Sequence, residues 1–157
     1  MRLFCVISIL LSISFASAQD PGNYRFTLDN GLRVVLMPSE SGEMTALVTL
    51  FDFGERHNPP DKSGLAHLIE HLYVTCATEN VPRRTADEWF AAYDYKVNAQ
   101  TGVDYTVIAT IFKNDRIEAE LVEAAERMVS LNITPADLQR ELPRLKNSAT
   151  CTSGSRI

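Results

Sequence analysis

The residues in this 157-residue sequence best suited to chemistry are two histidines and a glutamate. His67, Glu70 and His71 form the pattern H-x-x-E-H, the inverted form of the zincin motif H-E-x-x-H. On a helix, histidines four residues apart lie one above the other, so both imidazoles can reach one metal ion. Imidazole suits zinc, and an open coordination position lets zinc acidify water. The spacing therefore predicts zinc ligands at His67 and His71, with Glu70 as the group that accepts a proton from that water.

A helix from Gly64 to about Thr75, with Ser63 as its N-cap, is predicted to position this motif. At about 100° per residue, the motif residues fall on the side opposite an apolar stripe. We expect this stripe to pack against a sheet; it consists of Leu65, Leu68, Ile69 and Leu72. An alternative interpretation is an amphipathic helix whose polar face carries the three residues by chance.

The other predicted elements alternate between strands and helices along the chain. Asn30-Gly31 is typical of a hairpin turn, because glycine tolerates the positive φ that such turns require. We expect strands at 24–28, 32–37, 45–53, 95–101 and 104–112, and helices at 85–93, 114–131 and from Pro135 onward. The helix at 114–131 is predicted to begin with a cap at Asn114 or Asp115, and to present an apolar stripe of Ile117, Leu121, Ala124, Ala125 and Met128. The predicted fold class is α+β, a mostly antiparallel β-sheet with helices packed on one face.

Composition indicates an ordinary globular domain. Hydrophobic residues make up 45% and charged residues 22% of the chain, which excludes a disordered, collagen-like or coiled-coil protein. The net charge of −5 argues against nucleic acid as a partner, since a phosphate backbone requires a basic face. Three cysteines are too few for a disulfide scaffold.

Residues 1–18 are predicted to be a signal peptide. Arg2 supplies the positive start, Leu3–Phe15 the apolar region, and Ala16-Ser17-Ala18 the small residues before the cleavage site. The alternative, a membrane anchor, is disfavoured because this apolar region is shorter than the ~20 residues that span a bilayer. We therefore expect an exported protein, periplasmic or extracellular, with no membrane span after cleavage and one partial domain at 19–157.

Three segments resemble the pitrilysin (insulysin) family of zinc metallopeptidases, in the order in which the family has them. The first runs from Gly54-Glu55-Arg56 through Gly64-Leu65-Ala66 to the motif itself. The second is Val97–Thr101 followed by Tyr105-Thr106, and the third is Pro135–Leu138 followed by Arg140-Glu141. The resemblance covers about residues 24–148, nearly all of the chain that remains after cleavage.

This resemblance implies the N-terminal domain of a zinc metalloendopeptidase. It implies that His67 and His71 bind Zn²⁺ and that Glu70 is the general base and later the proton donor. Asn98 and Ala99 would bind the substrate backbone, which adds as an extra strand to an exposed sheet edge. Glu141 would be a supporting carboxylate.

The chain departs from the family at the third zinc ligand, a glutamate that aligns with Ser148. A serine hydroxyl is a poor zinc ligand, and Glu141 lies roughly 10 Å upstream along a helix, too far to replace it. Cys151, one helical turn beyond Ser148, is an alternative ligand, or a tail thiol that is free or paired with Cys76. Pro143 is expected to interrupt and kink this helix. Beyond Ser148 the sequence shows no apolar periodicity, which predicts a truncated domain.

Three functions from different classes are compatible with these features. The first is a zinc-dependent metalloendopeptidase domain that hydrolyses peptides or small proteins with a metal-activated water. The second is a non-catalytic or truncated relative that keeps the fold and binds a second homologous chain or domain, and Ser148 favours this one. The third is an unrelated exported binding protein in which the motif arose by chance. Bound zinc separates the third from the others, and peptide hydrolysis separates the first from the second.

Overall fold

The computed structural model of the chain describes residues 22–39, 42–93 and 97–145, together with the backbone of 146–152. The signal peptide expected at 1–18 lies outside the described residues. The chain divides into two units, one ending at Gly42 and one beginning at Glu43. Among the described residues, no helix has both the length and the apolar character that crossing a membrane would require.

The first unit contains a β-hairpin. Strand β1 (Tyr24–Thr27) pairs antiparallel with β2 (Arg33–Leu36), and Tyr24 lies opposite Leu36. Gly31 has a φ of 86°, in the left-handed region that favours glycine. The amide of Leu28 donates to the carbonyl of Leu32 at 2.9 Å and closes the turn. The predicted Asn30-Gly31 hairpin is thus confirmed.

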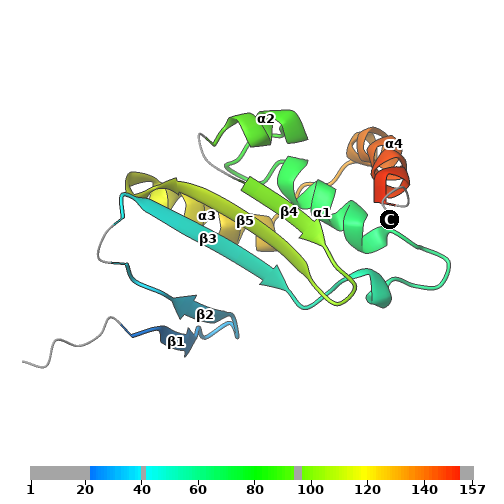
Figure 1. Ribbon diagram of the computed structural model, residues 1–157. Helices are drawn as coiled ribbons and strands as arrows, with labels where there is room; N and C mark the ends of the chain where they lie inside the picture. Colours follow the sequence, from blue (N-terminus) through cyan, green and yellow to red (C-terminus); the bar gives the residue numbers. More distant parts are fainter. Residues whose placement is uncertain (1–21, 40–41, 94–96, 153–157) are drawn as a thin grey trace, which may run out of the picture. The chain divides into compact units, whose positions relative to one another are not determined.

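The second unit is built on a three-stranded antiparallel sheet in the order β3-β5-β4 (Figure 1). The strands are β3 (Met44–Phe51), β4 (Val97–Thr101) and β5 (Thr106–Lys113). Every second residue of β5 is buried, as expected for a central strand with one face against a core. β4 lies at an edge, because β5 is its one neighbour among the described strands. The strands of the two units thus form two separate sheets.

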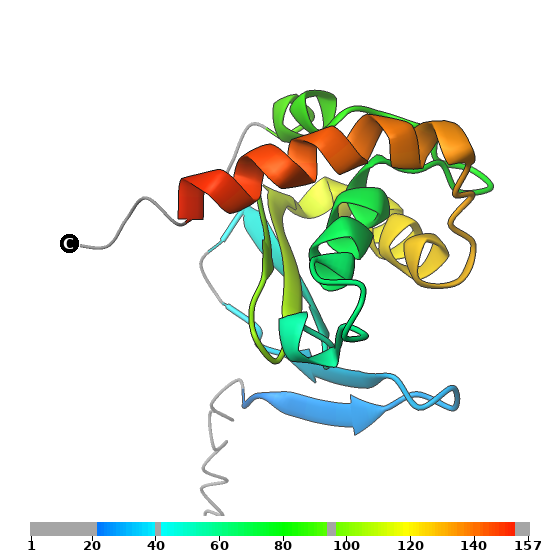
Figure 2. The same ribbon diagram turned by 90° about the vertical axis from the view of Figure 1, so that its right-hand side faces the viewer.

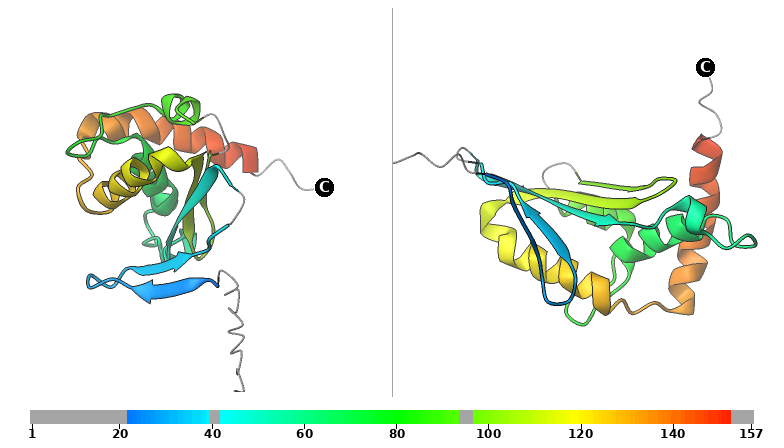
Figure 3. Two further views of the ribbon diagram at one scale, coloured as in Figure 1. Left: turned by 90° about the vertical axis from the view of Figure 1, so that its left-hand side faces the viewer. Right: turned by 90° about the horizontal axis from the view of Figure 1, so that it is seen from below.

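The helices of the second unit gather on one face of this sheet. They are α1 (Leu65–Thr75), α2 (Ala86–Ala91), α3 (Ile117–Val129) and α4 (Pro135–Thr152), with 3-10 turns η1 (Glu55–His57) and η2 (Asn114–Arg116). Figures 2 and 3 show α1 and α3 against the same face, with α4 running across α1. The predicted fold class, α+β with helices on one face of an antiparallel sheet, is confirmed.

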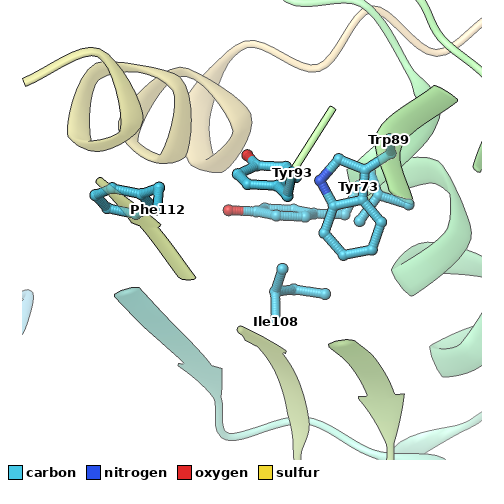
Figure 4. Packing of buried hydrophobic residues seen from close by; sticks show 6 residues of the cluster. Tyr73, Trp89, Tyr93, Ile108 and Phe112 are labelled. Carbon is cyan, nitrogen blue, oxygen red and sulfur yellow. The ribbon is translucent and has the colours of Figure 1, made fainter. Parts of the chain in front are cut away.

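Aromatic side chains form the main core between the sheet and the helices. Figure 4 shows five labelled members of this cluster; its six buried residues are Tyr73, Val74, Trp89, Tyr93, Ile108 and Phe112. Fully burying a large apolar side chain stabilises a fold by roughly 1.5–3 kcal/mol. This core therefore fixes α1 against β5, and with α1 it fixes the motif.

None of the four residues of the expected stripe on α1 belongs to the core that packs against the sheet, so that prediction was wrong. Tyr73 and Val74 make the contact instead. Ile69 is 43% exposed. The remaining buried members of the stripe belong to a second cluster, in which Leu68, Leu72 and Cys76 pack with Leu131 and Leu145. Periodicity locates an apolar face, but it does not identify the element that covers the face, and α1 is covered on more than one side.

Both helix starts predicted from capping residues were also wrong. The N-cap of α1 is Gly64 rather than Ser63, with a φ of 82° and no side-chain cap. The side chain of Asn58 takes that role from outside the helix, because its Oδ1 accepts from the amide of Ala66 at 2.8 Å. Residues 114–116 form η2 before α3, whose N-cap is Arg116.

In the later helices, the apolar stripe predicted on α3 lies mostly at the surface, and the interruption predicted at Pro143 does not occur. The predicted apolar stripe of α3 is largely exposed, with Leu121 at 51%, whereas the buried residues of this helix are Glu120 and Arg127. Helix α4 continues through Pro143 to Thr152. A proline removes one backbone hydrogen bond, which a long helix tolerates when the turns on both sides are intact.

Candidate metal centre

The structure brings His67, Glu70 and His71 together on one side of α1. The two imidazole rings lie edge to face, with centroids 4.8 Å apart. One ligand atom from each of the three residues lies within 4.8 Å of the others. Within the described part of the chain, this is the one group of three potential metal ligands. The helical spacing predicted this grouping.

His71 is held by a carboxylate from α4. Its Nδ1 lies 3.2 Å from Oε2 of Glu141, which is fully buried. A neutral His71 that donates from Nδ1 presents the lone pair of Nε2 to a metal, the usual arrangement of a ligating histidine. The donor chemistry of this pair therefore fits a zinc ion.

Glu141 is in turn fixed by a chain of charged residues. Arg140 donates from Nε to Oε1 of Glu141 at 2.8 Å and lies 3.0 Å from the carboxylate of Asp137. Asp137 is fully buried and accepts from Nε of Arg83 at 2.6 Å. Burial alone raises the pKa of Asp137, but hydrogen bonds from Arg83, Thr134 and Arg140 outweigh it, so this pKa lies well below its ordinary value. The carboxylate therefore stays charged and holds both arginines.

Sequence reasoning missed three members of this series of charged residues: Arg83, Asp137 and Arg140. Asp137 and Arg140 are three residues apart on one helix, so their spacing was a usable signal. Arg83 is 54 positions from Asp137, and no local pattern indicates such a pair. The arrangement matters because it orients Glu141 toward His71.

Glu70 is buried, with 6% of its surface exposed, and it contacts β4. The hydroxyl of Thr101 donates a hydrogen bond to Oε2 of Glu70. Thr101 also lies 3.5 Å from the hydroxyl of Thr106, which donates to the carbonyl of Phe53 at 2.9 Å. Sequence reasoning missed Thr101 as well, because the contact joins residues 31 positions apart.

A cleft of about 380 Å³ opens beside the motif. Glu70 and His71 line it from α1, Ala99 lines it from β4, and Glu141 lines it from α4. Asn98 is exposed and alternates with the half-buried Ala99 along β4. The two predicted substrate-binding residues therefore point to opposite faces of an edge strand, and of the two it is Ala99 that lines the cleft.

The position aligned with the family's third ligand lies in α4. Ser148 follows Glu141 by seven residues, about two turns later along this helix. The helix also includes Cys151, the alternative ligand. Both side chains lie outside the described part, so the identity of the third ligand stays a prediction. Cys76 is buried and forms no disulfide within the described residues, so its pairing with Cys151 stays a prediction.

The motif helix α1 thus packs between an antiparallel sheet and α4, which brings the carboxylate of Glu141 to His71. The model of the family "Insulinase (Peptidase family M16)" matches residues 33–149. The chain therefore belongs to this family. The family indicated by the sequence resemblance is confirmed, and the hypothesis of an unrelated protein with a chance motif is wrong.

Relatives and solved structures agree with this assignment. The zinc protease PqqE of Helicobacter pylori is 34% identical over 137 residues, which are 84% of this chain and 31% of that protein. The insulin-degrading enzyme of Drosophila melanogaster is 27% identical over 128 residues, 80% of this chain and 13% of that protein. The chain thus spans less than a third of either relative.

Two crystal structures have the same fold. A protease from Helicobacter pylori superposes with a TM-score of 0.68 and 30% identity, over 77% of this chain and 29% of that one. The first half of the periplasmic protease PqqL from Escherichia coli gives a TM-score of 0.72 at 20% identity, over 82% of this chain and 29% of that one. At 20% identity, the similarity to PqqL is evidence for a shared fold and for nothing further.

Proposed function

We propose that this chain carries the zinc-binding and proton-accepting part of an M16 metalloendopeptidase. The observation that supports it best is the group formed by His67, Glu70 and His71, with Glu141 behind His71. His67 and His71 would hold the ion. A bound zinc would supply Lewis acidity that lowers the pKa of a water molecule at the site.

The protein residues around the ion divide the remaining work. Glu70 accepts the proton of the attacking water and later donates it to the leaving amine. Glu141 keeps His71 in one tautomer and one orientation. The 6% exposure of Glu70 keeps bulk water from competing for its carboxylate.

The substrate in this proposal is an extended peptide that adds to the free edge of β4. Main-chain groups around Asn98 and Ala99 pair with the peptide, as in other cases of strand addition. Ala99 then brings the peptide beside the cleft that Glu70 and His71 line. The small side chain of Ala99 leaves room for the peptide next to the metal.

A second function, that of a subunit or part without activity of its own, is favoured by one observation. Ser148 occupies the α4 position aligned with a glutamate ligand, and serine binds zinc poorly. The chain also spans 31% of PqqE. We therefore expect weak zinc binding and little hydrolysis by residues 19–157 alone, and activity only with a partner chain or further sequence.

Export completes the proposal. The pattern of Arg2, Leu3–Phe15 and Ala16–Ala18 predicts cleavage after Ala18. The mature N-terminus would be Gln19, in the periplasm or outside the cell. Mass spectrometry of exported material tests this, and retention of Met1 would contradict it.

Zinc binding tests the proposal most directly. Competition with a chelator should show that the wild-type chain binds zinc and that the His67→Ala variant does not. Ser148→Glu should tighten binding by about tenfold or more, because a carboxylate supplies the third bond. Ser130→Glu, at the end of α3, is the matched control and should have no effect. Equal zinc affinities of the Ser148→Glu variant and the wild type would show that position 148 is not at the metal.

Hydrolysis of an unstructured peptide library separates the two functions. Any activity gained with a partner chain or a third ligand should disappear in Glu70→Gln, which keeps the shape but accepts no proton. Robust hydrolysis by the isolated wild-type chain, lost in Glu70→Gln, would instead mean that another residue completes the site, and Cys151 is the first candidate.

A further inference from the structure

The carboxylate of Glu70 is held by a hydrogen bond from β4. Its Oε2 accepts a hydrogen bond from the hydroxyl of Thr101, the last residue of β4. Hydrogen bonds to an ionised carboxylate are about twice as strong as those between neutral groups. With 6% of its surface exposed, Glu70 has little access to solvent that would replace this bond.

Thr101, which donates this hydrogen bond, lies beside a turn that backbone contacts hold in place. The amide of Gly102, the next residue, donates to the carbonyl of Tyr105 at 2.7 Å and closes the turn between β4 and β5. The carbonyl of Gly102 accepts from the amide of Glu55 at 3.0 Å. A Cβ at Gly54 would come within 2.6 Å of the Gly102 carbonyl oxygen, so the backbones are in close contact here. The backbone next to Thr101 is therefore held by contacts from two sides.

The three motif groups lie close enough together for all of them to reach one ion. Their ligand atoms lie within 4.8 Å of one another. A carboxylate is a good zinc ligand, and two histidine ligands leave coordination positions on zinc that a carboxylate could take. Without the hydrogen bond from Thr101, Glu70 would need a small movement to become that ligand.

We infer that Thr101 is a positioning residue that holds the Glu70 carboxylate out of the metal's coordination shell, so that it remains a base. This inference rests on the proposed function, since it takes His67 and His71 as the metal ligands. Without the Thr101 hydroxyl, the metal-free protein contains a buried carboxylate that lacks this donor. Zinc binding then compensates for the loss, so the affinity for zinc rises as Glu70 becomes a ligand.

The test compares zinc affinities by chelator competition on the full chain. Thr101→Val keeps the shape but lacks the hydroxyl, and it should bind zinc about tenfold more tightly than wild type. Thr101→Ser keeps the hydroxyl and should bind zinc as wild type does. Thr45→Val removes a β3 hydroxyl that bonds to Asn114 and serves as the matched control. In the Glu70→Gln background, Thr101→Val should change nothing, because the amide is a poor ligand.

Cobalt provides a second readout, because the visible spectrum of bound Co²⁺ reports the number and type of its ligands. The Co²⁺ spectrum of Thr101→Val should differ from that of wild type, and that of Thr101→Ser should not. An unchanged or lower zinc affinity in Thr101→Val overturns the inference, as does an equal gain in the Glu70→Gln background. Thr101→Ala repeats the comparison if the valine variant does not fold. If the wild type fails to bind zinc at all, the proposed function fails instead.

Discussion

Two groups of charged residues contact α1, one at its C-terminal end and one at the motif. At the end of the helix, Arg127 donates to the carbonyls of Tyr73 and Cys76 at 2.7 and 3.0 Å, and Arg84 donates to that of Val74 at 2.9 Å. Glu123 accepts from both arginines. At the motif, the chain of Arg83, Asp137, Arg140 and Glu141 leads to His71.

The two groups consist of similar charged residues, but their contacts end on different partners. Burial alone raises the pKa of Glu123, but the hydrogen bonds and charges of Arg127 and Arg84 outweigh it and lower this pKa, as happens at Asp137. The group at the helix end is closed, because Nη1 of Arg127 and Nε of Arg84 donate to the last carbonyls of α1, while Nη2 of Arg127 is buried without a hydrogen-bond partner among the described residues. The group at the motif is open, because its last member is an imidazole that lines a cleft. A shifted pKa therefore does not identify a site; a chain of contacts that ends in an available ligand does.

The largest effect on stability should come from removing Arg127 from the group at the end of α1. Arg127→Met removes a buried charge and leaves Glu123 and two helix carbonyls with fewer donors. We expect a loss of about 3–5 kcal/mol in the free energy of unfolding, measured in urea. Zinc affinity of the folded variant should stay within about twofold of wild type. Arg25→Met, on the exposed strand β1, is the control and should change stability by less than about 0.5 kcal/mol. A large loss of zinc affinity in Arg127→Met would mean that the two groups are coupled.

Acid should weaken the motif group through Asp137. The folded-state pKa of Asp137 lies below its ordinary value, so its contribution to stability is complete above the ordinary aspartate pKa of about 3.9. That contribution is lost as the pH falls from about 4 toward the folded-state pKa. At neutral pH, Asp137→Asn should therefore be less stable than wild type by roughly 2–3 kcal/mol. Urea unfolding at several pH values should show the difference shrinking below pH 4, and a difference independent of pH would contradict the assignment.

Local patterns predicted the elements of the fold well, and the contacts across the fold poorly. The i, i+4 spacing located His67 and His71 on one helix, and the Asn30-Gly31 pair located a hairpin. The same reasoning placed α1 against the sheet but chose the wrong residues for that contact, because an apolar stripe does not specify whether a sheet or a helix covers it. Ser63 was a plausible cap, but Asn58 satisfies the helix start from outside.

The part of the site that sequence could not provide is its long-range support. Thr101 reaches Glu70 across 31 positions, and Glu141 reaches His71 across 70. The family resemblance indicated a supporting role for Glu141, whereas Thr101 and Arg83 had no local signal. Such pairs depend on how the core residues of α1, α2 and β5 pack in three dimensions, which a local pattern does not contain.

Removing the last carboxylate of the motif group should affect zinc more than stability. Glu141→Gln keeps the size of the side chain, but it lacks the charge that orients His71 and pairs with Arg140. We expect zinc affinity to fall about 10–100-fold, measured by chelator competition. Glu126→Gln is the matched control, since Glu126 bonds to Thr78 and Asn80 rather than to the motif. The same loss in both variants would show that the effect is a general one of charge.

The smallest effect on stability should come from breaking an exposed ion pair that belongs to neither group. Arg56 and Asp104 lie 2.6 Å apart, but 62% and 54% of their side chains are exposed. Backbone bonds already join these segments, from the amide of Glu55 to Gly102 and from that of Arg56 to Val103, each at 3.0 Å. Arg56→Ala should therefore cost at most about 1 kcal/mol in unfolding, and the difference should vanish in high salt. A loss comparable to that of Arg127→Met would show that the turn between β4 and β5, and with it the Thr101 hydroxyl, depends on this pair rather than on the backbone.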